Sequence, residues 1–195
     1  MPSIPPPALA GDRLPTLPGN RLQLRWLTPG DVPAMFDLGS HPEVARYWSS
    51  PPMQDPAEAE ALLRDIHAQF AAKTLFQWGI ERLDDPVLVG SCTLHHLDFD
   101  HRHAEVGYSL RREFWGAGLM TEALTLLFDF AFETLDFHRL EADADPRNER
   151  SLRLLERLGF LREGYFRERY HVAGEIQDSV MLGLLRRDWR QRAAR

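Results

Sequence analysis

The alternation of hydrophobic and polar residues predicts a series of short strands along most of the chain. Leu22, Leu24 and Trp26 alternate with polar residues, as in a half-buried strand, and a Thr-Pro-Gly turn then leads into a short helix over 31–39. Six further segments have the strand pattern, and they cover residues 74–83, 87–97, 103–110, 139–144, 160–170 and 175–185.

Three longer segments repeat apolar residues at helical spacing. The helix over 55–70 begins with an aspartate N-cap, a proline and a glutamate three residues after the cap, which together form a capping box. A second helix covers 118–135, and a third covers 148–158 and ends at Gly159. The order of elements is β-α-α-β-β-β-α-β-α-β-β. Because a helix separates the fourth strand from the fifth, these two strands can lie parallel, so we expect one mixed α/β domain.

Composition narrows the class of protein. A chain of 195 residues with 44% hydrophobic and 27% charged residues is typical of one soluble globular domain, or two at most. The net charge of −6 argues against a nucleic-acid partner and is compatible with a cationic substrate. A single cysteine can form no internal disulfide, which favours a cytoplasmic location.

The first twenty residues differ from the rest of the chain. They hold six of the 14 prolines and almost no charge, which predicts a proline-rich flexible arm over 1–20, followed by one domain over 21–190. The arm lacks the pattern of a signal peptide. The longest apolar stretch, LTLLFDFAF, is interrupted by Asp129 and is far shorter than the roughly 20 residues that a membrane helix needs, so we expect no membrane partner.

Two glycines lie where a predicted strand leads into the long helix. In the segment RREFWGAGLMTEAL, Gly116 and Gly118 would let a ligand approach backbone N–H groups at the positive end of that helix, which suits a pyrophosphate. The segment lacks the third glycine of a dinucleotide-binding loop and the lysine of a P-loop. A purely structural turn explains two glycines equally well.

Glu105 is a candidate for acid–base chemistry. In the strand over 103–110 it shares one face with Gly107 and Ser109, so a carboxylate lies beside two small residues that leave room for a ligand. A solvated glutamate paired with a neighbouring cationic side chain is the ordinary alternative. Asn148 and Ser151, at the start of the last predicted helix, are explained by capping and by an exposed first turn, and only their place after a parallel strand makes them candidates.

Four histidines lie in the run HHLDFDHRH, at His95, His96, His101 and His103. Imidazole and carboxylate groups suit zinc or manganese, but the spacing matches none of the familiar zinc patterns, so we expect a polar loop and no metal. Cys92 shares a strand face with apolar residues and is expected to be a buried thiol rather than a nucleophile.

The segments FWGAGLMTEAL and NERSLRLLERLGF, taken with the element order, resemble the GNAT superfamily of acetyl-CoA-dependent N-acetyltransferases. Three more segments, HPEVARYW, AEVGYSL and GEIQDSVMLGLLRRDW, are similar to its RimJ/RimL-like branch. The resemblance covers about residues 21–189. It implies a mostly antiparallel seven-stranded sheet with helices on both faces, in which parallel strands four and five splay apart around the cofactor.

The resemblance also implies an acetyl-CoA site and no metal cofactor. Strand backbone groups and Asn148 would contact the pantetheine arm, and amides of the glycine loop would hold the pyrophosphate. The implied cofactor-binding residues are Tyr108, Ser109, Leu110, Gly116, Ala117, Gly118, Leu119, Met120, Thr121 and Asn148. One departure is Glu113, where relatives often have glutamine or arginine.

The chemistry of amine acetylation assigns roles to two side chains. An amine attacks a thioester only when it is neutral, so a base is useful, and we expect Glu105 to serve directly or through water, provided that apolar surroundings raise its pKa. Ser151, by its match to a serine in the RimL-like branch, is the candidate donor to the departing thiolate. A buried Cys92 makes direct transfer the better expectation than an acetyl-cysteine intermediate.

The acceptor is the open part of this prediction. RimJ/RimL-like enzymes acetylate N-terminal amines of ribosomal proteins, so we expect a protein N-terminus or a small primary amine, with Tyr47, Trp48 and Trp78 lining its pocket. A spermidine-like polyamine is the alternative, although the resemblance places Leu155 where the polyamine enzymes have a catalytic tyrosine. A non-catalytic acetyl-CoA-binding module also stays open, as does a homodimer.

Overall fold

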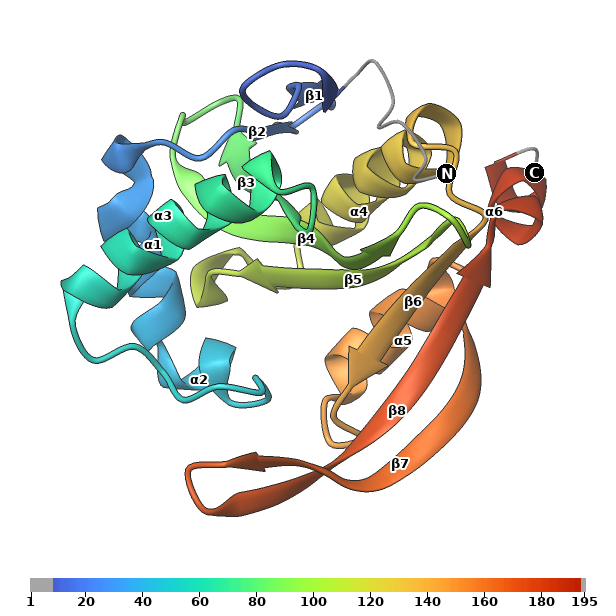
Figure 1. The fold of residues 1–195 in the computed structure, drawn as a ribbon. Helices are drawn as coiled ribbons and strands as arrows, with labels where there is room; N and C mark the ends of the chain where they lie inside the picture. Colours follow the sequence, from blue (N-terminus) through green and yellow to red (C-terminus); the bar gives the residue numbers. More distant parts are fainter. Residues whose placement is uncertain (1–8, 194–195) are drawn as a thin grey trace.

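The protein is described by a computed structural model that covers residues 9–193, and a mixed eight-stranded sheet runs through it (Figure 1). The order across the sheet is β1-β2-β3-β4-β5-β6-β8-β7. The strands are β1 (Leu17–Pro18), β2 (Leu22–Arg25), β3 (Phe76–Arg82), β4 (Leu88–Asp98), β5 (His103–Leu110), β6 (Arg139–Ala144), β7 (Leu161–Val172) and β8 (Glu175–Leu185). Sequence predicted seven strands, and the eighth is β1, whose two residues pair antiparallel with β2.

Strands β5 and β6 are parallel, and they separate after a short stretch. Their pairing covers three positions, which match His103 with Arg139, Ala104 with Leu140, and Glu105 with Glu141. β5 then continues to Leu110 while paired only with β4. The expected splaying of two parallel strands is therefore confirmed, and the facing edges beyond Glu105 have no strand partner among the described residues.

Helices cover both faces of the sheet, as expected (Figure 1). They are α1 (Val32–Ser40), α2 (Pro42–Ala45), α3 (Pro56–Ala71), α4 (Leu119–Asp129), α5 (Glu149–Arg157) and α6 (Arg186–Ala193). α1 and α3 enclose a small core around Met35 and Ile66, whereas α4 and α5 contribute to a larger one that includes Phe128 and Leu155. None of the helices within residues 9–193 is long and apolar enough to cross a bilayer.

The N-terminal segment packs on the domain over the part that the structure describes. Leu9 and Leu14 are buried in the main core, and the indole N–H of Trp78 donates a hydrogen bond to the carbonyl of Pro15 at 2.9 Å. The expectation of a flexible arm is therefore wrong for residues 9–20, because isolated leucines between the prolines have apolar surface to bury. Residues 1–8 of the expected arm lie outside the described residues.

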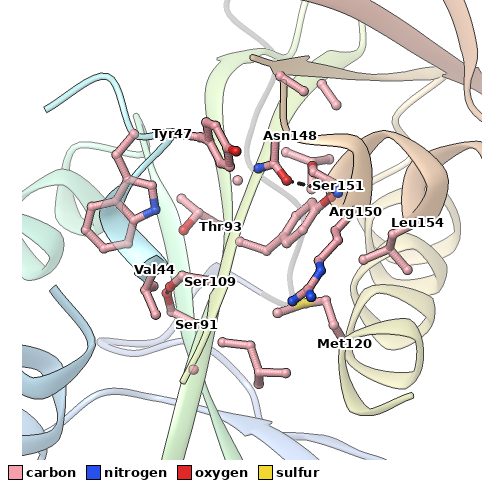
Figure 2. A pocket seen from close by; sticks show the side chains of 18 of the residues that line it. Val44, Tyr47, Ser91, Thr93, Ser109, Met120, Asn148, Arg150, Ser151 and Leu154 are labelled. Atoms are coloured by element: carbon pink, nitrogen blue, oxygen red, sulfur yellow. Dashed lines mark hydrogen bonds between the residues drawn. The ribbon is translucent and has the colours of Figure 1, made fainter. Parts of the chain in front are cut away.

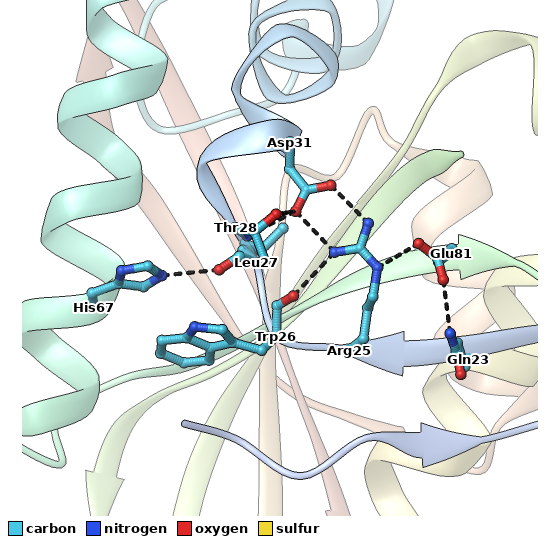
Figure 3. Close-up of polar contacts among 8 residues, drawn as sticks. All are labelled: Gln23, Arg25, Trp26, Leu27, Thr28, Asp31, His67 and Glu81. Atoms are coloured by element: carbon cyan, nitrogen blue, oxygen red, sulfur yellow. Dashed lines mark hydrogen bonds and ion pairs between the residues drawn. The ribbon is translucent and has the colours of Figure 1, made fainter. Parts of the chain in front are cut away.

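A buried ion-pair cluster connects β2 to the start of α1 (Figure 3). The guanidinium of Arg25 donates two hydrogen bonds to Asp31, at 2.7 and 2.8 Å, and a third to Glu81 of β3. Burial alone would raise the pKa of the Asp31 carboxyl, but the hydrogen bonds from Arg25 and Thr28 outweigh burial and lower it. The cluster fixes the direction in which the chain leaves β2, and thereby the position of α1 beside β4.

Candidate active site

One large cleft opens between the separated strands, and most of the residues singled out in the sequence line it. Its volume is about 1580 Å³. In Figure 2, Asn148, Arg150 and Ser151 lie on one side, with Tyr47 across from them. The sequence-predicted residues that line the cleft are Tyr47, Trp48, Glu105, Tyr108, Ser109, Leu110, Gly116, Gly118, Leu119, Met120, Thr121, Asn148 and Ser151.

The glycine loop, which runs from Gly116 to Gly118, forms the end of the cleft at the N-terminus of α4. Gly118 is the N-cap residue and has a φ of +76°, while Gly116 has a φ of +82°, so both need the conformational freedom of glycine. No side chain caps α4, and the N–H groups of its first turn are therefore available to an anion. Ala117 does not line the cleft, and its carbonyl accepts a hydrogen bond from the Arg21 guanidinium at 2.9 Å.

A set of hydrogen bonds among Asn20, Arg21 and Glu122, called the clamp below, holds this loop, and the sequence analysis did not predict it. The Glu122 carboxylate in the first turn of α4 accepts hydrogen bonds from the backbone N–H groups of Asn20 and Arg21 and from the Arg21 side chain, each at 2.8 Å. Partial burial alone would raise the pKa of Glu122, but these hydrogen bonds and the Arg21 charge lower it. Arg21 thus connects the start of β2 to both Glu122 and the glycine loop.

Arginines line the cleft near the glycine loop, and sequence reasoning missed them. Arg150, Arg153 and Arg157 extend from α5 into the lining, and Arg112 joins them. The guanidinium carbons of Arg112 and Arg150 lie 4.8 and 5.1 Å from the centre of the Trp115 ring. The signal was present in the sequence, since arginines three and seven residues apart share one face of a helix.

Two hydroxyl groups meet in the middle of the cleft. The Tyr108 hydroxyl lies 2.7 Å from the Ser151 hydroxyl, and Asn148 Oδ1 accepts the Ser151 N–H at 3.2 Å. Burial raises the pKa of the Tyr108 phenol, so Tyr108 keeps its proton at neutral pH and can donate to Ser151. The sequence drew attention to the backbone of Tyr108, whereas the structure brings its side chain to Ser151.

Glu105 lies at the other end of the cleft between two imidazoles. Its Oε2 is 2.9 Å from His96 Nδ1, its Oε1 is 3.8 Å from His95 Nε2, and its side chain is 13% exposed. The apolar surroundings expected for this carboxylate are therefore not found. Burial lowers the pKa of His95, although the Glu105 charge opposes that effect.

The three aromatic residues expected in the acceptor pocket have different positions. Tyr47 and Trp48 line the cleft, and the guanidinium of Arg147 lies 5.9 Å from the centre of the Tyr47 ring. Trp78 is fully buried between the sheet and the N-terminal segment, so the expectation that it lines the pocket is wrong. Cys92 is also fully buried, which confirms the expectation of a buried thiol, and burial raises the pKa of that thiol.

Comparison with known proteins agrees with the family resemblance. Residues 21–161 match the family model described as an acetyltransferase (GNAT) domain. The chain is 36% identical to YdaF of Bacillus subtilis (strain 168), over 86% of this chain and 93% of YdaF. It is 33% identical to the ribosomal protein uS5-alanine N-acetyltransferase of Escherichia coli (strain K12), over 66% of this chain and 65% of that one.

A solved structure shows the same fold. The spermidine N-acetyltransferase from Vibrio cholerae, in complex with CoA and spermine, superposes with a TM-score of 0.78 at 24% identity. The match covers 87% of this chain and 98% of that chain. The parted strands, the uncapped glycine turn and these matches lead to one conclusion: the chain belongs to the GNAT family of acetyltransferases and is an N-acetyltransferase.

Proposed function

We propose that the protein transfers an acetyl group from acetyl-CoA directly to a primary amine, with the α-amine of a protein N-terminus as the first candidate acceptor. The observation that carries this proposal is one cleft that joins an uncapped helix N-terminus to the Glu105 carboxylate. An anion site and a proton acceptor in one cleft are what transfer from a nucleotide-linked thioester to an amine requires.

The residues present fit acetyl-CoA along the length of the cleft. The free edge of β5 at Tyr108, Ser109 and Leu110 would pair with the amides of the pantetheine arm, beside Asn148. The amides between Gly116 and Thr121 would hold the pyrophosphate. The arginines of α5 would supply positive charge for the remaining phosphate, because they line the same cleft and Arg150 lies over Trp115, next to the loop.

In the proposed reaction, the neutral amine nitrogen attacks the thioester carbonyl carbon. The C–N bond forms first, and the Glu105 carboxylate takes the surplus amine proton, directly or through water, before the C–S bond breaks and the CoA thiolate leaves. Backbone N–H groups of β5 would stabilise the oxyanion of the tetrahedral intermediate. Ser151, positioned by Tyr108, would donate a proton to the departing thiolate and recover it from solvent.

The charges in the cleft favour an acceptor with one amine over a polyamine. Of the other carboxylates that line the cleft, Asp143 accepts a hydrogen bond from Tyr170 at 2.7 Å and lies 3.1 Å from Arg169 Nε. Asp145 is paired with the Arg147 guanidinium. These two carboxylates are already neutralised, which weakens the attraction for a polycation.

Two further observations bear on the acceptor. At pH 7 about one α-amine in ten is neutral, against about one lysine ε-amine in a few thousand, which favours an N-terminal acceptor. The uS5-alanine N-acetyltransferase of Escherichia coli is a relative whose name states a ribosomal protein as its substrate. A spermidine-like polyamine is the second candidate, because the spermidine N(1)-acetyltransferase of Escherichia coli (strain K12) is 26% identical over 83% of this chain.

An acceptor panel tests the proposal. It would contain peptides with a free N-terminus, the same peptides with a blocked N-terminus and one internal lysine, spermidine, and small primary amines, with acetylated products detected by mass. We expect turnover of free N-termini and little turnover of the blocked peptides. Faster turnover of spermidine would favour the second candidate, and acetyl-CoA binding in calorimetry without any product would favour a non-catalytic module.

A further inference from the structure

A β-bulge at the end of β4 turns two consecutive histidines towards one carboxylate. Pairing of β4 with β5 matches His95 with Glu105, then shifts before it resumes between Asp98 and His103. His96, inside the bulge, has a φ of +47°. In a regular strand neighbouring side chains point to opposite faces, and a bulge changes that direction. Here both imidazoles come to lie beside Glu105.

The three side chains form a compact set of ligand atoms. His96 Nδ1 is 2.9 Å from Glu105 Oε2, His95 Nε2 is 3.8 Å from Oε1, and one ligand atom from each residue falls within 4.8 Å of the others. Nitrogen and oxygen ligands at about 2.0–2.2 Å in a tetrahedral zinc site are separated by roughly 3.3–3.5 Å. Side-chain rotations that move these atoms by about an ångström would therefore bring all three onto one ion.

Accessibility also suits an ion from solution. The Glu105 and His95 side chains are 13% and 27% exposed and are held by paired strands, whereas His96 is 76% exposed. All three line the open cleft, so an ion can reach them and can keep water in its remaining position. Imidazole and carboxylate are the ligands that zinc and its neighbours in the first transition row accept.

We propose that His95, His96 and Glu105 bind one divalent transition-metal ion of the zinc type at the acceptor end of the cleft. The spacing of the histidine run did not predict this site, because its third ligand comes from a different strand. A bound ion would occupy the carboxylate that is proposed to take the amine proton. That inhibitory consequence rests on the proposed function, whereas the binding itself does not.

The test measures binding directly and needs no activity. Untagged, metal-free protein would be titrated with Co²⁺, whose visible absorption reports its coordination, and then with Zn²⁺ in calorimetry and in displacement of Co²⁺. We expect one ion per chain and a rise in Tm on adding Zn²⁺, since a ligand of the folded state stabilises it.

Two matched variants locate the ion. His96→Asn removes an imidazole and keeps a residue type that tolerates positive φ. We expect it to weaken Zn²⁺ binding at least about 10-fold, because removing even a residue that only hydrogen-bonds to a metal ligand costs that much. His101→Asn is the control, because His101 is equally exposed and contacts Asp98 instead. It should leave the affinity unchanged.

Three outcomes would overturn the proposal: no saturable binding at one equivalent, equal losses in both variants, or a loss only in His101→Asn. If His96→Asn fails to fold, as judged by circular dichroism, His95→Gln takes its place with the same expected loss. Failure of the acceptor panel would leave the binding result intact, so the two proposals can fail separately.

Discussion

The two ends of the cleft are built from different parts of the polypeptide. The end at α4 consists largely of backbone, with two glycines, an uncapped first turn and the free edge of β5. The other end consists of side chains, with Glu105 from β5, His95 and His96 from β4, and Tyr47 after α2. A site made of backbone binds groups common to every reaction of a family, whereas a site made of side chains can change with each acceptor.

The contrast also applies to how each end is held in place. The glycine loop depends on a short local sequence and on the clamp from Glu122 and Arg21. The acceptor end depends on several segments that meet only after the sheet has formed. A substitution at the first end should therefore affect cofactor binding, and one at the second should affect turnover.

The largest expected effect is at the side-chain end. We expect Glu105→Gln to lower kcat/KM by about 100-fold or more, the range typical for loss of a general base, with little change in acetyl-CoA affinity. Glu141→Gln is the control, because Glu141 is the residue that pairs with Glu105 on β6 and is bound to Arg139 instead. Wild-type activity of Glu105→Gln at pH 7 would remove Glu105 as the base.

A smaller effect is expected at the backbone end. Gly118→Ala forces a side chain into a left-handed conformation, at a cost of about 1–2 kcal/mol, and should weaken acetyl-CoA binding by about 10-fold in calorimetry. Gly174→Ala carries similar strain at a φ of +87° in the β7–β8 turn, far from the glycine loop in sequence. If both variants lose acetyl-CoA affinity to the same extent, the result would contradict a specific role of the glycine loop in cofactor binding.

The hydroxyl pair between the two ends should have a modest effect. A thiolate can take its proton from water, so we expect Ser151→Ala to lower kcat only a few-fold, well below the loss caused by removing the base. Tyr108→Phe should give a similar loss, and the double variant should be no slower than either single one if both act through one hydrogen bond. Additive losses would show that the two hydroxyls act separately.

The smallest effect concerns the clamp on the glycine loop and depends on pH. The pKa of Glu122 is lowered in the folded protein, so its contribution to stability is present above the unfolded value of about 4.3 and is lost as the pH falls through the folded value. We expect Glu122→Gln to lower Tm by about 2–4 °C at pH 7, for a loss of about 1 kcal/mol, and the difference to shrink towards pH 3.

An exposed pair provides the control for this experiment. On α3, Glu60 Oε2 lies 3.9 Å from Arg64 Nη1, and both side chains are largely exposed to solvent. Glu60→Gln should therefore leave Tm nearly unchanged at both pH values. A gap between wild type and Glu122→Gln that is constant with pH would show that the charge of Glu122 is not what stabilises the loop.

Much of the fold could be predicted from local patterns. Seven strands and four helices follow the alternation, capping and turn signals, and Asp55 and Asn148 are the N-cap residues expected. The missed elements give little local signal: β1 has two residues, α2 has four, and α6 is mostly charged. Their positions depend on tertiary contacts that no single window of sequence contains.

The candidate site was predictable to a lesser degree. The backbone end could be predicted, because two glycines beside the start of a helix indicate a turn that leaves the backbone N–H groups accessible to a ligand. The burial of Trp78 was predictable, since the alternation in β3 places Trp78 on the inward face of the strand with Phe76 and Ile80. The bulge at His96 could not be foreseen, because it depends on the register of β4 against β5. The clamp at Glu122 could not be foreseen either, because its partners Asn20 and Arg21 are about a hundred residues away in the sequence.

The short contact between β5 and β6 has a consequence for the lifetime of the protein. Three paired positions join β5 to β6, so the cleft interrupts the pairing between β1–β5 and the strands that follow. A ligand that fills this gap at 100 times its Kd would add about 2.7 kcal/mol to the free energy of unfolding. Resistance to proteolysis would then rise and fall with the supply of acetyl-CoA, and the amount of this enzyme would follow the metabolic state that provides its substrate.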